Sequence, residues 1–492
     1  MTSVKKEIAQ GIFWIALAKY SGIVISLGIT AILARNVSPE AFGTMAIATV
    51  LMVFLDIFTD MGIGAAIVQF KTLSKKQINT LFTAGLCAGG VLSLVLFLSA
   101  DTIARYYGDP TLAGVCRYLC ICLFFNALNI VPNGLMLREK RFRTIALRTL
   151  SVQIICGSIA VAGALHGWGI YALLVTPVLS SVGVFAVNYC NYPQSVVLRP
   201  DLSAIRTVWS YSAFQFLFCV CNYFSRNADK LVIGKYFTMA DLGYYDKSYR
   251  LMQLPLQNIT FVISPVLHPI LSTLQSDKQE LARKNTTLVR YIASLSFPIG
   301  LSLFFGAHDI VNILFGAAWE PAVPVFRILA LSLPLQMILS TSGALFQAAG
   351  KTDHMFYVGV MNTAVTVTGF LVAALGFGTL TAMAWAWDIT LFINFVNSYA
   401  VMYRRSFYSR WTEVYRAILP QTINTAFVAT ATIILYRYVS FQNIFGSLAW
   451  IVGTVSLLTF IMAALLRQYN ILLTAKKLLF KSPNITFSET EH

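Results

Sequence analysis

About fourteen stretches of this chain are apolar for roughly 17 to 25 residues each, the length at which an α-helix crosses the hydrocarbon of a bilayer. Lipid offers no partner to a free N–H or C=O, so such spans must be helices whose backbone bonds are made internally. Charged residues make up only 11% of the chain, against about 25% in an average soluble domain. We therefore expect an all-α integral membrane protein whose function depends on the polar residues that the spans retain.

The expected spans divide into three groups along the chain. They cover residues 11–34, 41–66, 78–100, 112–135, 145–165 and 168–190, then 207–234, 242–270, 288–314, 324–348, 356–377 and 380–402, and finally 414–436 and 446–468. Because the number of spans is even, both ends of the chain are expected on the same side of the membrane.

The distribution of basic residues indicates which side that is. Lys and Arg near span ends are retained in the cytoplasm. With the N-terminus inside, most of the 36 Lys and Arg residues fall in cytoplasmic segments. The outer segments hold only Arg35, Arg105, Arg117, Lys235, Arg327 and Arg437. We predict a multi-pass protein with both termini cytoplasmic, and the same bias explains the net charge of +16 without a nucleic-acid partner.

Part of the first half of the chain recurs in the second half. The residues that recur in register are Arg35, Ser38 and Gly43 in the first copy and Lys235, Thr238 and Gly243 in the second. Repeated halves of this kind commonly build transporters that hold their substrate between the halves. We expect a six-helix lobe over residues 1–200, a second over 201–403, a central cavity, and two further helices with a cytoplasmic tail over 404–492.

Several short motifs lie in and around these repeats. They are Leu33-Ala34-Arg35, Pro39, Phe42-Gly43, Asp60-x-Gly62 with Gln69, Leu242-Gly243-Tyr244-Tyr245 and Leu314-Phe315-Gly316-x-x-Trp319-x-Pro321-x-x-Pro324. With them, the chain from about residue 5 to 470 resembles the Wzx-type polysaccharide exporters of the MATE-like MOP superfamily, and is nearest to colanic-acid-type exporters.

This resemblance implies that the chain flips undecaprenyl-pyrophosphate-linked oligosaccharide from the inner to the outer leaflet of the bacterial inner membrane. The product would serve exopolysaccharide or lipopolysaccharide synthesis. Membrane lipids, a polysaccharide polymerase and a chain-length regulator are the partners expected, and no cofactor is expected.

Charged residues inside spans are informative because each costs about 2.5–3.5 kcal/mol at the bilayer centre. Helical spacing places Arg226, Asp229 and Lys230 on one helix face together with Tyr223. In the next span, the same spacing places Asp246, Lys247 and Arg250 on one face, with Tyr249 nearby. Bases outnumber acids over residues 226–250. The predicted substrate-binding residues are Arg226, Lys230, Lys247, Arg250, Tyr223 and Tyr249, since cations neutralise a pyrophosphate and aromatic faces pack on sugars. The alternative is local ion pairing with Asp229 and Asp246, combined with snorkelling at the interface.

The first half carries a second set of charges, namely Lys19 in the first span and Asp56 and Asp60 in the second. The two carboxylates are four residues apart and share a helix face. Two acids near one base can hold a proton or cation, so ion-gradient coupling is predicted here, with Asp388 as a further candidate. The alternative is a structural ion pair of Lys19 with one carboxylate.

The sequence also bears on three other classes of protein: ATPases, membrane polymerases or ligases, and multidrug exporters. Ala349-Gly350-Lys351-Thr352 imitates a phosphate-binding loop but has Leu345 where the motif requires glycine, which argues against an ATPase. A membrane polymerase or ligase is disfavoured because the longest outer connection is only about sixteen residues and carries no catalytic set. The eight cysteines lie in apolar spans, so no disulfide framework is expected. Cys116, Cys120 and Cys122 lie close in sequence but no histidine accompanies them, so no metal site is expected. We expect no enzyme, and the alternative is a MATE-like, cation-coupled multidrug exporter.

Overall fold

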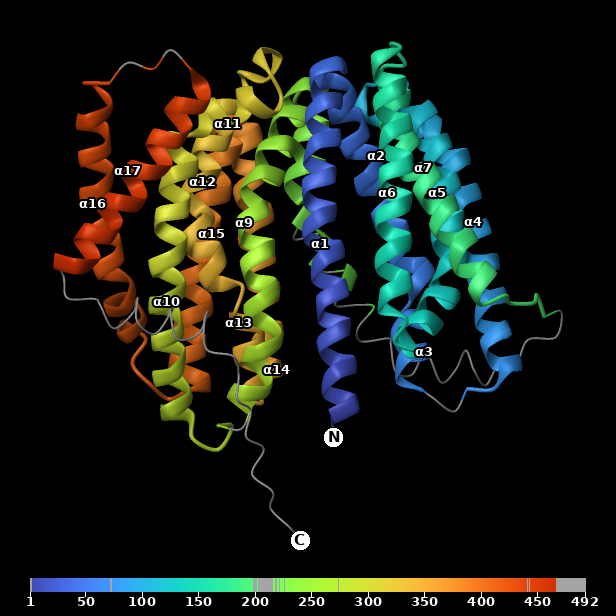
Figure 1. Ribbon diagram of the computed structural model, residues 1–492, viewed down its shortest axis with the longest axis horizontal. Helices are drawn as coiled ribbons and strands as arrows, with labels where there is room; N and C mark the ends of the chain where they lie inside the picture. The colour runs from blue at the N-terminus through green and yellow to red at the C-terminus, as the bar shows by residue number, and fades with distance from the viewer. Residues whose placement is uncertain are drawn as a thin grey trace, which may run out of the picture. The chain divides into compact units, whose positions relative to one another are not determined.

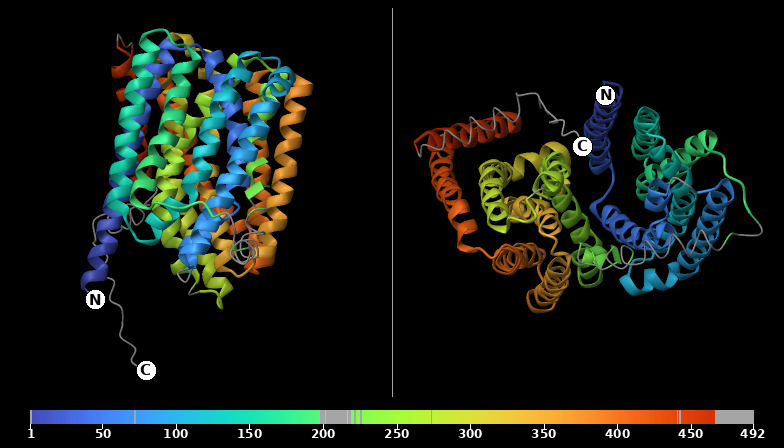
Figure 2. Two further views of the ribbon diagram at one scale, coloured as in Figure 1. Left: turned by 90° about the vertical axis from the view of Figure 1, so that its right-hand side faces the viewer. Right: turned by 90° about the horizontal axis from the view of Figure 1, so that it is seen from below.

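The computed structural model describes most of the chain. The residues described are 2–70, 73–197, 201, 216, 219–220, 222–224, 226–272, 274–439, 441 and 443–465. Within them the regular structure is helical and no strand occurs, so the expected all-α class is confirmed. Figure 1 shows the helices in chain order, and Figure 2 adds two further views.

The chain forms two compact units, each assembled from segments that are distant in sequence. The first consists of Met1–Leu251, Val311–Phe326 and Val360–Thr390, and the second of Met252–Ile310, Arg327–Gly359 and Leu391–His492. The expected lobe boundaries at residues 200 and 403 stay predictions, as does the cavity between the lobes.

The first unit is built mainly from long helices that pack side by side, α4 against α5, α1 against α6, and α5 and α6 against α7. Its helices are α1 (Thr2–Asn36), α2 (Pro39–Asp60), α3 (Ile63–Gln69), α4 (Lys75–Tyr107), α5 (Thr111–Arg138), α6 (Phe142–Leu165) and α7 (Ile170–Asn191). Residues 226–236 are also helical. This unit has a buried apolar cluster that includes Ile67, Leu81 and Val131.

The second unit contains α10 (Lys278–Phe305), which packs against α16 (Thr412–Tyr436) and α17 (Ile444–Leu465). It also holds the short helices α13 (Ser342–Ala348) and η3 (Met402–Ser406). Five helices contribute residues to both units: α9 (Met239–Ser272), α11 (Ala307–Leu314), α12 (Ala322–Leu339), α14 (Thr352–Val372) and α15 (Leu380–Val401). The short elements η1 (Ala317–Trp319) and η2 (Ala373–Phe377) complete the order.

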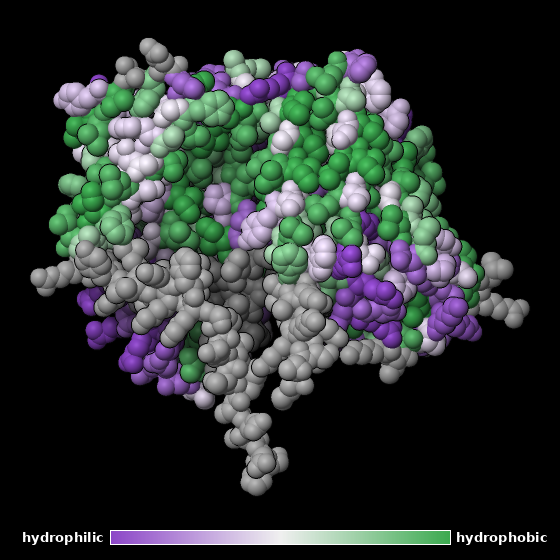
Figure 3. All heavy atoms as spheres, in the orientation of Figure 1, coloured by the Kyte–Doolittle hydropathy of each residue, from purple (hydrophilic) through white to green (hydrophobic). Residues whose placement is uncertain are grey.

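Eleven helical segments of the described residues are long and apolar enough to cross a membrane. Each corresponds to one of the fourteen expected spans. Of the other three spans, 207–234 lies largely outside the described residues, and 242–270 and 380–402 fall in α9 and α15, which are helical but less apolar. Figure 3 shows hydrophobic side chains over the middle of the helices and hydrophilic ones nearer their ends. The protein is a multi-pass membrane protein, and the number fourteen stays a prediction.

Three expected spans are interrupted in the structure. One of them, the span over 324–348, breaks at Ser340 and Thr341, between α12 and α13. The span over 41–66 ends at Asp60, where Met61 and Gly62 take left-handed conformations with φ of 38° and 79° and α3 begins. The span over 288–314 ends at Phe305, one residue before Gly306, and α11 follows as a separate helix. The apolar pattern continues across the breaks at Met61 and Gly306, so hydropathy alone could not reveal these two.

The N-termini of α2 and α9 approach each other at two glycines. A Cβ atom on Gly43 would lie 1.8 Å from the carbonyl oxygen of Met239, and one on Gly243 would lie 2.1 Å from that of Pro39. Only glycine allows two backbones to come this close. Because Gly43 and Gly243 are equivalent positions of the sequence repeat, the contact is reciprocal between the two copies.

The two repeated bases make reciprocal contacts as well. The Arg35 guanidinium donates a hydrogen bond to the carbonyl oxygen of Ile313 (2.6 Å), and the Lys235 ammonium donates one to that of Tyr106 (2.6 Å). In each case a base of one copy binds a helix end of the other. These contacts explain why the repeat retains a base at this position.

Candidate functional site

Three bases of the first unit surround the carboxylate of Asp246. Lys230 Nζ lies 2.8 Å from Asp246 Oδ1, Arg250 Nε lies 2.9 Å from Oδ2, and Lys247 Nζ lies 3.9 Å from Oδ2. Lys247 and Arg250 come from the same helix as Asp246, whereas Lys230 comes from the preceding helix. We call these four residues the Asp246 cluster.

The Asp246 cluster carries more positive than negative charge. Three bases share one carboxylate that is only 2% exposed, which leaves a net charge of +2 if all four groups are ionised. Aromatic rings offset part of the excess, since Lys247 Nζ lies 4.3 Å from the ring centroid of Phe42 and Lys230 Nζ lies 5.7 Å from that of Tyr249. The Arg250 side chain is 58% exposed, which makes it the accessible cation of the cluster.

A row of aromatic side chains extends from this cluster. Tyr245 stacks on Tyr249 with ring centroids 6.3 Å apart, Tyr249 meets Trp387 edge-on at 5.1 Å, and Trp387 stacks on Phe370 at 6.1 Å. All four rings belong to the first unit. The row brings α15, and with it the predicted residue Asp388, to the neighbourhood of Tyr249.

The other predicted substrate-binding residues lie along the helix that carries Lys230. Arg226 is exposed one turn before Lys230 and forms no ion pair with the described residues. Tyr223 is buried, donates a hydrogen bond to the carbonyl oxygen of Val50 and packs against Phe54. Asp229, the expected partner of these bases, instead accepts a hydrogen bond from the backbone N–H of Lys230 (2.8 Å). Arg226 is thus available to a ligand, whereas Tyr223 fixes its helix to α2.

The predicted ion-coupling residues of the first half differ in their surroundings. Asp56 Oδ2 accepts a hydrogen bond from Asn126 of α5 (3.2 Å), and Asp56 Oδ1 is buried without a hydrogen-bond partner among the described residues. Asp60 is exposed and accepts from the backbone N–H of Gly64 (3.2 Å), so it caps α3. Lys19 is half-buried on α1, which packs against α6. Of the two carboxylates, Asp56 is therefore the one with a buried oxygen that no described residue satisfies, whereas Asp60 is exposed.

One polar network of the first unit was not predicted. The Arg148 guanidinium of α6 donates hydrogen bonds to Asn188 of α7 and to Asn133 of α5, and Asn188 donates one to Asn129 (2.7 Å). The sequence places Arg148 near the cytoplasmic end of its span, where a base is expected only to indicate which side of the membrane is cytoplasmic. The sequence does place Asn129, Asn133 and Asn188 near those ends of their spans that are predicted to be cytoplasmic, which is the signal for such a network.

No group of three or more His, Cys, Asp or Glu side chains that could hold a metal ion occurs in the described part of the chain. The bases of the Asp246 cluster and Arg226 instead offer ion pairing and hydrogen bonding to an anionic ligand.

A model of one protein family, described as polysaccharide biosynthesis protein, matches residues 32–324. The chain belongs to this family. The match covers Asp56 and all four residues of the Asp246 cluster, and it ends before Trp387 and Asp388. The resemblance proposed from the sequence motifs is therefore confirmed at the level of the family.

Curated relatives are similar over most of their length. The teichuronic acid biosynthesis protein TuaB of Bacillus subtilis is 26% identical over 404 residues, covering 80% of this chain and 82% of that protein. The lipopolysaccharide biosynthesis protein WzxC of Escherichia coli is 24% identical over 440 residues, covering 85% and 86%. The succinoglycan biosynthesis transport protein ExoT of Rhizobium meliloti is 25% identical over 387 residues, covering 77% of each chain.

Solved structures show the same fold at low identity. The inward closed conformation of the lipid II flippase MurJ is similar with a TM-score of 0.74 and 14% identity, covering 94% of this chain and all of that one. An inward-facing multidrug resistance MATE family transporter is similar with a TM-score of 0.58 and 13% identity, covering 82% and 94%. This family member thus has the fold of MOP superfamily transporters.

Proposed function

We propose that this chain flips undecaprenyl-pyrophosphate-linked oligosaccharide repeat units across the bacterial inner membrane for surface polysaccharide synthesis. Membership of the polysaccharide biosynthesis family supports it, and so do relatives named for teichuronic acid, lipopolysaccharide and succinoglycan synthesis. The chain is a transporter and catalyses no covalent step.

The Asp246 cluster is the observation that carries this proposal. A pyrophosphate presents several anionic oxygens, and bases that already outnumber their acid can bind it without first breaking every internal ion pair. Arg250, as the exposed member, makes the first contact with a bidentate guanidinium. Arg226 adds a further cation one helical turn from Lys230.

The aromatic row gives this site its affinity for sugars. Tyr249 and Trp387 present flat apolar faces next to the bases, and such faces pack against the pyranose rings attached to the pyrophosphate. Tyr223 contributes indirectly, because it holds the helix of Arg226 and Lys230 against α2.

Transport against a gradient needs an energy source, and the buried carboxylate of Asp56 is the group we propose to bind the coupling proton or cation. Its second oxygen has no hydrogen-bond partner among the described residues, so an incoming ion meets an unsatisfied acceptor there. Asp60, Lys19 and Asp388 are the further candidates.

Both ends of the chain are proposed to be cytoplasmic. A polysaccharide polymerase and a chain-length regulator are proposed to act on the flipped product.

Deletion of the gene in its source bacterium tests the function. Lipid-linked oligosaccharide should accumulate in the cytoplasmic leaflet and surface polysaccharide should be lost, and a plasmid copy should restore both. Unchanged surface polysaccharide together with increased drug sensitivity would replace this proposal by the multidrug exporter.

Single substitutions test the site. Arg250→Ala and Arg226→Ala should reduce export at normal membrane abundance, and Arg250→Lys should restore only part of it because the bidentate guanidinium is lost. Arg405→Ala, which removes an exposed arginine far along the chain in η3, is the control. Full export by both alanine variants would show that these bases do not hold the substrate.

A further inference from the structure

The second unit contains a cavity of about 700 Å³ that lies apart in sequence from every residue of the Asp246 cluster. It opens where α10 and α16 begin and η3 ends. The residues that line it include Arg283 of α10, Arg404 of η3, the loop residues Tyr408, Ser409 and Arg410, and Glu413 of α16. Cavities of this size commonly hold small ligands.

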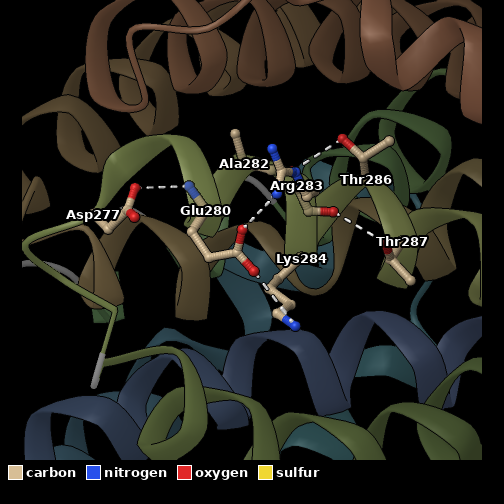
Figure 4. Close-up of polar contacts among 7 residues, drawn as sticks. All are labelled: Asp277, Glu280, Ala282, Arg283, Lys284, Thr286 and Thr287. Atoms are coloured by element: carbon tan, nitrogen blue, oxygen red, sulfur yellow. Dashed lines mark hydrogen bonds and ion pairs between the residues drawn. The ribbon is translucent and has the colours of Figure 1, made fainter.

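The lining is rich in positive charge. Three arginines face one carboxylate, which leaves a net charge of +2. Figure 4 shows Arg283 bound to Glu280 (3.2 Å), a residue that also pairs with Lys284 (3.4 Å). Arg404 and Arg410 form no ion pair with any residue that the structure describes, so both guanidinium groups are available to a ligand.

Buried hydrogen bonds fix the frame that carries these arginines. The fully buried Tyr403 donates a hydrogen bond to the carbonyl oxygen of Ala282 (3.2 Å) and accepts one from Asn285 (3.0 Å). Thr286 Oγ1 lies 2.9 Å from the same hydroxyl, and Figure 4 shows Thr286 one turn after Ala282 on α10. The hydroxyl therefore ties η3 to α10, and a preorganised set of cations loses less entropy on binding an anion.

The backbone of the lining loop is held in an uncommon conformation. Tyr408 has a φ of 54°, in the left-handed region that few non-glycine residues adopt. The backbone N–H of Ser409, the next residue, donates a hydrogen bond to the carbonyl oxygen of Tyr403 (2.9 Å), which stabilises this turn. Such strain persists where the surrounding structure imposes it, often at ligand sites. The turn brings Ser409 and Arg410 onto the cavity.

The cavity's position suggests where the anion comes from. α10 and α16 are both long and apolar enough to cross the membrane, and the cavity lies where the two helices begin. Arg404 also lies over the ring of Trp411, with its Cζ atom 5.2 Å from the centroid, and tryptophan is enriched at the level of lipid headgroups. Basic pockets between helices at this depth suit lipid phosphates.

We propose that the cavity lined by Arg283, Arg404 and Arg410 binds the phosphate group of an anionic membrane lipid. The guanidinium groups of Arg404 and Arg410 bind the phosphate oxygens, and Ser409 adds a hydroxyl donor. The residues that line this cavity belong to the second unit, and none of them belongs to the Asp246 cluster of the first unit. The phosphate can belong to a phospholipid headgroup or to a polyprenyl diphosphate.

Binding to the purified full-length protein in a non-ionic detergent tests this proposal. The ligands are short-chain phosphatidylglycerol, a short-chain polyprenyl diphosphate and, as the zwitterionic comparison, short-chain phosphatidylcholine, with native mass spectrometry as the readout. At least one of the two anionic lipids should bind about tenfold tighter than phosphatidylcholine, and which one does so identifies the source of the phosphate.

The variant Arg404→Gln with Arg410→Gln should weaken that binding about tenfold or more. Arg405→Gln is the matched control, because Arg405 is the exposed neighbour of Arg404 but does not line the cavity, and it should change binding less than twofold. Unchanged thermal melting without lipid verifies that the variants fold. Equal loss in the control, or no preference for either anionic lipid over phosphatidylcholine, would overturn the proposal.

Discussion

At the scale of single residues, the ratio of three bases to one carboxylate decides how the Asp246 cluster behaves. Asp246 is almost completely buried, so the attraction between it and its partners is weakly screened by water. Removing the carboxylate deprives two nearly buried ammonium groups, those of Lys230 and Lys247, of the ion-pair partner that they share. Breaking a buried pair in this way costs about 3–5 kcal/mol.

Asp246→Asn should therefore lower membrane abundance and the melting temperature of the purified protein. Asp101→Asn is the control, since Asp101 pairs with Arg117 at 2.6 Å but is exposed, and exposed pairs contribute little. Melting in detergent, followed by intrinsic fluorescence, gives the melting temperature of each variant, and an immunoblot of isolated membranes gives its abundance. Equal stability of the two variants would mean that the Asp246 cluster is already well hydrated.

Asp56 and Asp60 share a helix face but have different environments, and this difference predicts different roles. Asp56→Asn should abolish the dependence of transport on a proton or sodium gradient, because the buried oxygen that would receive the ion is lost. Asp60→Asn should keep that dependence, since Asp60 caps α3 at its exposed end. Transport into vesicles with and without each gradient distinguishes the two. Retained dependence in Asp56→Asn would assign Asp56 a structural role.

At the scale of elements, the crossing of α2 and α9 links the sequence repeat to the structure. The register of the sequence repeat and the recurrence of residue types are enough to show that Gly43 and Gly243 are equivalent positions. What sequence could not reveal is that each glycine faces the backbone of the other copy, because the contact joins positions 200 residues apart. The interruptions at Met61 and Gly306 were missed for a related reason, since apolar residues continue across both breaks.

Gly43→Ala should strongly reduce the amount of folded protein, because its Cβ would lie 1.8 Å from the carbonyl oxygen of Met239 and the two helices would have to separate. Gly114→Ala in α5 is the control, since nothing lies within 4 Å of its Cβ position and alanine favours helix over glycine by up to about 1 kcal/mol. Size-exclusion chromatography of a fluorescent fusion gives both amounts. Normal yield of Gly43→Ala would show that the crossing can open without loss of the fold.

At the scale of the whole molecule, sequence predicted the class well and the sites only in part. Span length and the scarcity of charge identify an all-α membrane protein because lipid imposes both. Helical spacing placed Lys247 and Arg250 beside Asp246, since these contacts are local. It could not predict that Lys230 reaches Asp246 from another helix, nor that Tyr403 brings Arg404 to Arg283. Contacts between distant segments depend on packing, which periodicity does not encode.

The membrane orientation is a property of the whole chain and follows from the distribution of Lys and Arg. In a variant without natural cysteines, Ser276→Cys should react with a membrane-impermeant maleimide only after cells are lysed, because residue 276 lies in a segment predicted to be cytoplasmic. Ala317→Cys should react in intact spheroplasts, since the segment around η1 is predicted to lie outside. Both positions are exposed and both native residues are small, so neither change disturbs packing. The reverse pattern would invert the orientation and place the cavity of Arg404 and Arg410 in the outer leaflet.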